Sequence, residues 1–183
     1  MTRWAILNLA IVAAAWAQPT KPPEPAKGTE VSLGGLKSKT PAEWLAQKPA
    51  NRLRHFQFKL PKADGDSYDA ELFALDMHGS PADNITRLTD LFIPPNNTPP
   101  EKVVTKTEIQ LSKAKLTILD MHGTYLVKTQ PIDKTVKENR PEYRMIAVLW
   151  ESKDGGYTIR LIGPRKTVER HAAAFTAWLK NFK

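Results

Sequence analysis

The sequence predicts an α+β fold: a mostly antiparallel sheet of about six strands, with one mid-chain helix and one C-terminal helix packed on it. Two observations support this class. Short runs of alternating apolar and polar residues follow one another between turn residues, which is typical of strands linked by hairpins. The C-terminal segment then adds a helical period directly after a hairpin, so a helix is available to cover the sheet.

The closing segment, residues 143–183, shows the clearest pattern. Residues 143–150 are largely apolar on both faces, which indicates a central strand, and the glycines within residues 153–156 supply the positive φ of a hairpin turn. Residues 157–162 form the returning strand, which a glycine-proline pair ends. The helix that follows has an apolar stripe that we expect to dock on the sheet; a helix lying on a membrane surface is the alternative. The stripe consists of Val168, Ala172, Phe175, Leu179 and Phe182.

The domain is expected to begin near Pro41, with Trp44 as the anchor of a helical turn or packed loop. Residues 52–60 and 69–77 alternate and are separated by a turn, so both are expected to be strands. Residues 80–83, Ser-Pro-Ala-Asp, then open a helix. Serine caps free N–H groups, proline fits the first helical position, and aspartate suits the positive end of the helix dipole.

The stretch before the closing segment is less regular. Residues 103–111 and 114–119 are expected to pair as a hairpin, and residues 124–127 continue the strand pattern after a break at Gly123. Residues 128–142 are polar and contain two prolines, which indicates a long exposed loop.

Three regions of the chain are expected to differ in role. Residues 1–17 have the features of a signal peptide: a positive Arg3, an apolar stretch, and small residues around the cleavage point. The apolar stretch is shorter than the ~20 residues of a membrane span, so an uncleaved anchor is the alternative and no stable span is expected after cleavage. Residues 18–40 are rich in proline and lysine and predict a disordered tether. Residues 41–183 form a single domain, which we expect to be periplasmic or secreted.

The composition excludes several classes of function. The chain has no cysteine, so disulfides, thiolate metal sites and cysteine nucleophiles are excluded. Its net charge of +8 is spread along the chain, whereas nucleic-acid binders show a clustered basic face, so no nucleic acid is expected as a partner. The nearest approach to a cluster is a solvated face or, alternatively, a contact for an anion or an acidic polymer. It consists of Arg160, Arg165, Lys166 and Arg170.

The string Leu-Asp-Met-His-Gly occurs twice, at residues 75–79 and 119–123. On a strand, an aspartate and a histidine two residues apart point to the same face. If the two strands were neighbours, two carboxylates and two imidazoles could meet and bind zinc or another divalent ion. The alternative is a pair of ordinary strand ends at which glycine makes the turn. The four candidate ligands are Asp76, His78, Asp120 and His122.

The sequence contains none of the common catalytic motifs. It has no Gly-x-Ser-x-Gly nucleophile elbow, no glycine-rich phosphate loop and no His-Glu-x-x-His zinc motif. Its carboxylates form no recognisable acid–base pair, and no cofactor is expected. A hydrolase with an unrecognised site is therefore a weaker hypothesis, which carboxylates clustered in a deep cleft would favour.

Five short strings stand out along residues 41–183. They are Lys62–Asp66, Asn84-x-x-Arg87, Gly123–Tyr125, Tyr143–Met145 and Gly163-Pro164. In this order they are similar to strings in a group of small exported bacterial proteins of unknown function that are abundant in planctomycetes. The overall plan also resembles the PsbP-like fold, an antiparallel sheet with helices packed on its faces.

Members of the PsbP-like fold act largely as binding or assembly subunits, so this resemblance implies a non-enzymatic role. Four polar residues of the matching strings line a shared surface or, as the favoured alternative, satisfy buried hydrogen bonds. These are Asn84, Arg87, Tyr125 and Arg144. Fold alone does not fix function.

The leading hypothesis is an exported, non-enzymatic binding or assembly protein of the bacterial cell envelope. Its partner would be an unknown envelope protein or polymer. The first alternative is a metal-binding protein that uses the repeated aspartates and histidines, and the second is the hydrolase.

Overall fold

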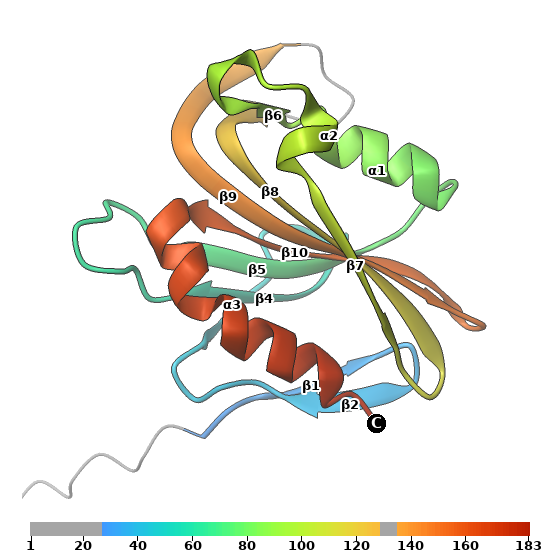
Figure 1. The fold of residues 1–183 in the computed structure, drawn as a ribbon. Coiled ribbons are helices and arrows are strands. Elements are labelled where there is room, and N and C mark those ends of the chain that lie inside the picture. Colours follow the sequence, from blue (N-terminus) through green and yellow to red (C-terminus); the bar gives the residue numbers. More distant parts are fainter. Residues whose placement is uncertain (1–26, 129–134) are drawn as a thin grey trace, which may run out of the picture.

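The described residues of the computed structural model, 27–128 and 135–183, form ten β-strands, three α-helices and one 3-10 turn (Figure 1). The strands divide between a two-stranded and an eight-stranded sheet, with antiparallel pairing throughout. The α+β class is confirmed, but the sheet is larger than expected. The predicted signal peptide, residues 1–17, lies outside the described residues. Among those described, no helix is long and apolar enough to cross a membrane.

The order of strands places the closing hairpin in the middle of the large sheet. The order is β3–β4–β5–β10–β9–β8–β6, and β7 also pairs with β8. The central position of β9 and β10 explains why residues 145–150 of β9 and residues 158–164 of β10 are largely apolar, since both faces of the sheet are covered there. The bounds are Leu45–Gln47 (β3), Arg54–Leu60 (β4), Ala70–Asp76 (β5), Phe92–Ile93 (β6), Thr105–Gln110 (β7), Ala114–Lys128 (β8), Val136–Ser152 (β9) and Gly155–Pro164 (β10).

Strands β8 and β9 are much longer than the sequence indicated. They have 15 and 17 residues, and they stay paired as far as Lys128 and Val136. The long loop expected over residues 128–142 is therefore wrong from Val136 onward. The outer part of this pair leaves both faces exposed or partly exposed, so it lacks the apolar alternation by which a strand is recognised.

At Gly123 the main chain of β8 passes close to that of β6. The φ of Gly123 is 152°, and a Cβ at this position would lie 2.3 Å from the carbonyl oxygen of Ile93. The register shifts between Gly123 and Tyr125, so β8 continues through a bulge where the sequence suggested a break. Figure 1 shows both long strands curving toward β6 and α2. The curvature makes one face of the sheet concave.

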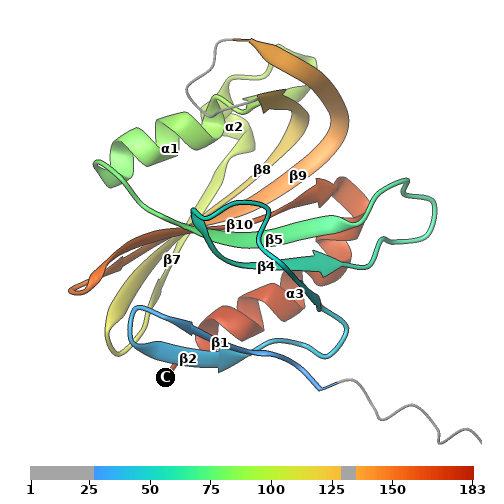
Figure 2. The same ribbon diagram turned by 180° about the vertical axis from the view of Figure 1, so that it is seen from behind.

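Helix α3 (Arg165–Lys180) covers one face of the large sheet, as the apolar stripe predicted. It lies in front of β4 and β5 in Figure 1 and behind them in Figure 2. The core beneath it is rich in aromatic rings, and Trp178 packs edge-on against Trp44 with ring centroids 5.6 Å apart. Trp44 is 2% exposed, so it anchors the packed loop that the sequence indicated.

The β1–β2 hairpin corrects the expectation of a disordered tether over residues 18–40. Strands β1 (Glu30–Leu33) and β2 (Leu36–Lys39) pair with each other and pack against the same core as α3. Lys37 also exchanges main-chain hydrogen bonds with Lys183, at 2.9 and 3.1 Å. The many prolines and lysines of the segment hid a two-residue alternation whose apolar members are at most 4% exposed: Val31, Leu33 and Leu36. Residues 18–26 of the expected tether lie outside the described residues.

Helix α1 (Pro81–Thr89) covers the opposite face, where Leu88 and Leu91 join a second buried cluster with Met145 and Leu149. Ser80 caps α1 as expected: its hydroxyl accepts a hydrogen bond from the main-chain N–H of Asp83 at 3.1 Å. The carboxylate of Asp83 accepts one in return from the N–H of Ser80 at 3.3 Å. The short η1 (Pro95–Asn97) and α2 (Pro100–Val103) then lead into β7.

Candidate functional site

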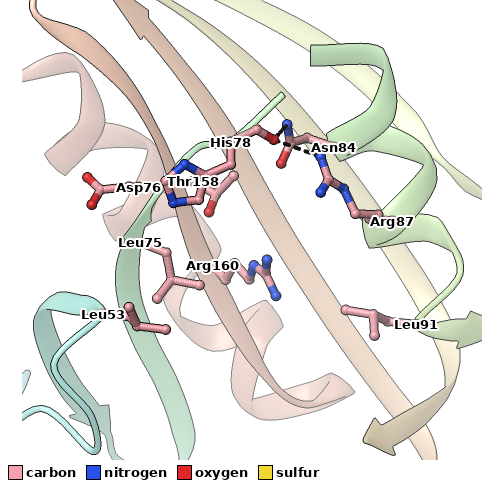
Figure 3. Close-up of a pocket in the computed structure, with 9 residues that line it drawn as sticks. All are labelled: Leu53, Leu75, Asp76, His78, Asn84, Arg87, Leu91, Thr158 and Arg160. Atoms are coloured by element: carbon pink, nitrogen blue, oxygen red, sulfur yellow. Dashed lines mark hydrogen bonds between the residues drawn. The ribbon is translucent and has the colours of Figure 1, made fainter. Parts of the chain in front are cut away.

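A pocket of about 200 Å³ opens between α1, the loop before β4, and the strands β5 and β10 (Figure 3). Its walls combine three leucines with several polar side chains. The lining residues are Leu53, Leu75, Asp76, His78, Asn84, Arg87, Leu91, Thr158 and Arg160. The pocket lies on the face of the sheet that α1 covers.

The alternation of β10 places Arg160 at this pocket. Ile159 and Leu161 point into the core beneath α3, so Thr158 and Arg160 face the other side. Arg160 is paired across the sheet with Phe73 of β5, and its guanidinium carbon lies 5.9 Å from the centre of that ring. Figure 3 shows the guanidinium between the leucines on the two sides of the pocket.

The guanidinium of Arg160 has no hydrogen-bond or ion-pair partner among residues 27–128 and 135–183, and its Nε is fully buried. Burial is the main cause that lowers the pKa of Arg160. The nearby cations Arg54 and Arg87 lower that pKa further, whereas Tyr125 acts in the opposite direction. Arginine still carries its charge at neutral pH. The pocket therefore presents a partly buried positive charge without a counterion in the described chain.

Arg54 lies on the same face of the sheet, and its guanidinium has hydrogen-bond acceptors. Its Nη1 donates to Glu71 at 2.6 Å and to Gln57 at 2.9 Å, and its guanidinium carbon lies 3.9 Å from the centre of the Phe73 ring. The two arginines thus lie near the same phenylalanine ring, but only Arg54 has a carboxylate partner. The contrast identifies Arg160 as the unusual group.

Two of the sequence candidates, Asn84 and Arg87, line the pocket and hold its upper edge. Both donate to the main-chain carbonyl of His78, Asn84 from Nδ2 at 3.0 Å and Arg87 from Nη2 at 2.7 Å (Figure 3). Nε of Arg87 also donates to the carbonyl of Asp83 at 3.2 Å. These contacts fix the segment between β5 and α1. Both side chains satisfy main-chain carbonyls, but only Asn84 is buried, and Arg87 is exposed.

The other two candidates, Tyr125 and Arg144, lie in different places. Tyr125 is within electrostatic reach of Arg160, and burial raises the pKa of its phenol. Arg144 lies on the face beneath α3 and pairs with Asp120, so it is not part of the pocket. The basic cluster expected around Arg160 also separates, because its other three members are exposed on α3: Arg165, Lys166 and Arg170.

The structure does not bring the two Asp-Met-His-Gly strings together. Strand β5, which ends at Asp76, is separated from β8 by both β10 and β9, a distance of about 14 Å at ~4.8 Å per strand. Asp76 instead pairs with His55 at 2.7 Å, and Asp120 pairs with Arg144. No group of three or more potential metal-binding side chains occurs in the described parts of the chain. The neighbouring strands that the metal hypothesis required are therefore not formed.

Only indirect signs of this pocket are present in the sequence. The sequence pattern places Arg160 in a basic cluster on a solvated face, and it gives no sign of a role for Thr158 or the three leucines. One sign was available: an arginine in the middle of an otherwise apolar strand that lies beside another apolar strand. On a central strand such a charge points to a face of the sheet, where it is covered unless it has a partner or opens onto a pocket.

No protein-family model matches the chain. No curated protein matches it either. Among solved structures, it is similar to PsbP from the cyanobacterium Synechocystis, with 13% identity, a TM-score of 0.47, and coverage of 91% of this chain and 96% of that one. It is also similar to a protein of unknown function from Pseudomonas aeruginosa, with 14% identity, a TM-score of 0.43, and coverage of 84% and 94%. The geometry of the pocket, rather than these similarities, bears on function.

Proposed function

We propose that this chain is an exported, non-enzymatic binding protein of the bacterial cell envelope, built on a PsbP-like plan. Its ligand presents an anionic group to Arg160 in the pocket between α1 and the sheet. The observation that carries this proposal is the partly buried guanidinium of Arg160, which lacks a partner among the described residues. The sequence features of residues 1–17 support export.

A buried charge without a partner costs stability, because the protein interior solvates it less well than water does. Two other arginines on the faces of the sheet avoid this cost: Arg54 pairs with Glu71, and Arg144 pairs with Asp120. A group that lowers stability and opens onto a pocket is typical of a binding site that is completed by its ligand. An anion would supply the missing counterion.

The side chains of the pocket favour binding over catalysis. Asp76 is the one carboxylate among its lining residues, and it pairs with His55. The clustered carboxylates that would favour a hydrolase are therefore not found at this pocket. A guanidinium with leucines around it provides recognition of charge and apolar surface, which is sufficient for a binding protein.

The experiment that tests the binding site compares Arg160→Gln with Arg165→Gln. Arg165 is an exposed arginine on α3, so its replacement changes the net charge equally without touching the pocket. Isothermal titration of the full chain with sodium acetate, butyrate and phosphate should show binding that the Arg160 variant loses by tenfold or more and the Arg165 variant keeps. Equal binding by both variants would show that Arg160 does not bind the anion and would contradict the proposed site.

Export is tested separately. Residues 1–40 fused to a reporter enzyme that is active only outside the cytoplasm should give activity in a bacterial host, and deletion of residues 4–14 should abolish it. If the reporter stays inactive with the intact segment, the proposal of export to the cell envelope is wrong. The proposed binding site does not depend on this result.

A further inference from the structure

The apolar walls of the pocket suggest what is attached to the anionic group. Leu53, Leu75 and Leu91 come from three separate parts of the chain and surround the guanidinium of Arg160 (Figure 3). Leu53 is 71% exposed at the rim, which is the largest exposure among the large apolar side chains in the described residues. A ligand with an apolar portion would cover this leucine and remove it from water.

The charges at the pocket match one negative charge better than two. Arg87 uses Nε and Nη2 on main-chain carbonyls, and Arg54 is paired with Glu71. Arg160 is therefore the one pocket cation, among the described residues, whose donors are all uncommitted. Asp76 at the same pocket disfavours a second negative charge. A phosphate dianion would remain partly uncompensated here.

A carboxylate fits the donors that remain. Thr158 lies two residues before Arg160 on the same face of β10, and its hydroxyl makes no hydrogen bond with the described residues. The planar fork of a guanidinium matches the two oxygens of a carboxylate, and a hydroxyl can donate to a remaining lone pair. The two residues thus form a small recognition unit on one strand.

The volume limits the length of the apolar portion. A pocket of about 200 Å³ has room for about seven groups of water size, at roughly 30 Å³ each. We propose that the ligand is a monocarboxylate with a short alkyl chain, whose carboxylate binds Arg160 and Thr158 and whose chain contacts the three leucines. This inference rests on the proposed function and names the ligand class for the same site.

The test is a titration series on the full chain, followed by isothermal calorimetry or by NMR shifts of the Thr158 and Arg160 amides. The series is acetate, butyrate, hexanoate and decanoate, with inorganic phosphate and hexanol as probes that lack one of the two features. Each added methylene should tighten binding by up to about fourfold until the pocket is full near hexanoate. Decanoate should gain little more than hexanoate.

Matched variants assign the two parts of the site. Arg160→Gln should weaken hexanoate at least tenfold and leave hexanol unchanged, while Arg165→Gln leaves both unchanged. Leu53→Ser should weaken hexanoate a few fold and leave acetate unchanged. Leu45→Ser, at a second exposed leucine on the edge strand β3, should have no effect on either ligand.

The outcomes separate this inference from the proposed function. If phosphate binds through Arg160 as tightly as hexanoate, or if chain length has no effect, the ligand class is wrong and the anion site stands. If no anion binds in an Arg160-dependent way, both are wrong. Carboxylate binding that tightens with chain length, and that Arg160→Gln weakens at least tenfold, supports both.

Discussion

Asp120 on β8 and Arg144 on β9 form a two-point ion pair across neighbouring strands. Nε and Nη2 of the guanidinium lie 2.8 and 2.5 Å from the two oxygens of the carboxylate. Hydrogen bonding to Asp120 is the main cause that raises the pKa of Arg144. The pair occupies both oxygens of Asp120, one of the four ligands considered for a metal, and it shows how this sheet normally accommodates an arginine.

We expect Asp120→Asn to lower the free energy of unfolding by about 1–2 kcal/mol, because it leaves a partly buried guanidinium without its charged acceptor. Urea unfolding at neutral pH would measure the change. Asp154→Asn, in the exposed turn between β9 and β10, is the control and should change stability by less than about 0.5 kcal/mol. Equal effects would show that the ion pair contributes nothing measurable.

The opposite result is expected at Arg160. Replacing it with methionine removes an uncompensated charge and keeps most of the side-chain volume, so the free energy of unfolding should rise by about 1 kcal/mol. For a domain of this size the melting temperature would rise by about 2–4 °C. Thermal melting without ligand measures this, with Arg165→Met as the control. A lower melting temperature would indicate that Arg160 stabilises the sheet and is not held for a ligand.

Leu36→Ala tests whether the N-terminal hairpin belongs to the domain. Leu36 is 2% exposed and packs in the core beneath α3, so truncation should cost about 2–5 kcal/mol. Leu45→Ala, at a leucine that is 50% exposed, should have little effect. If the two variants have similar unfolding free energies in urea, residues 27–40 do not stabilise the domain and act as a tether.

Gly123→Ala tests the close approach of β8 to β6. The new methyl group would lie 2.3 Å from the carbonyl oxygen of Ile93, and a main-chain atom cannot move aside easily, so a loss of about 1–3 kcal/mol is expected. Gly65 also has a positive φ, but a Cβ there meets no atom within 4 Å. Gly65→Ala therefore measures the cost of the positive φ alone, without a steric contact. Chemical unfolding should show a larger loss of unfolding free energy for Gly123→Ala than for Gly65→Ala. The reverse order would contradict the contact.

The cap of α1 predicts a dependence on pH. Hydrogen bonds from Ser80 are the main cause that lowers the pKa of Asp83 below its ordinary value of 3.8. The lowered pKa contributes stability above that value, and this contribution is lost as the pH falls through the folded-state pKa. Ser80→Ala should cost about 1 kcal/mol near neutral pH and less in acid. Ser112→Ala, in an exposed turn, should show no such dependence in unfolding at neutral and acidic pH.

The sequence predicted the elements whose pattern is strong and local. The strand–turn–strand–helix of residues 143–183 was recognised because both strands are apolar and the helix has a clear stripe. The cap of α1 was recognised from Ser80, Pro81 and Asp83, since all its contacts lie within one helical turn. Local chemistry was sufficient in both cases.

The elements that were missed depend on distant partners. Strand β2 is short, and its docking requires Lys183 and the core beneath α3. The outer half of the β8–β9 pair is held by main-chain hydrogen bonds, which leave little trace in side-chain type. The pocket combines β5, β10, α1 and the loop before β4, so the lack of a partner at Arg160 became visible only once the strand order was known.

The main-chain bonds between Lys37 and Lys183 have a consequence for the timing of folding. A ribosome makes residue 37 early and residue 183 at the end of this sequence, so β2 must wait for the partner that fixes it. The hairpin contacts among β8, β9 and β10 join residues closer in sequence and can form sooner. We therefore expect the part of the core beneath α3 that β1 and β2 cover to close late. We propose that this chain leaves the cytoplasm. Late closure of this part of the core would help to keep the chain unfolded while it is exported.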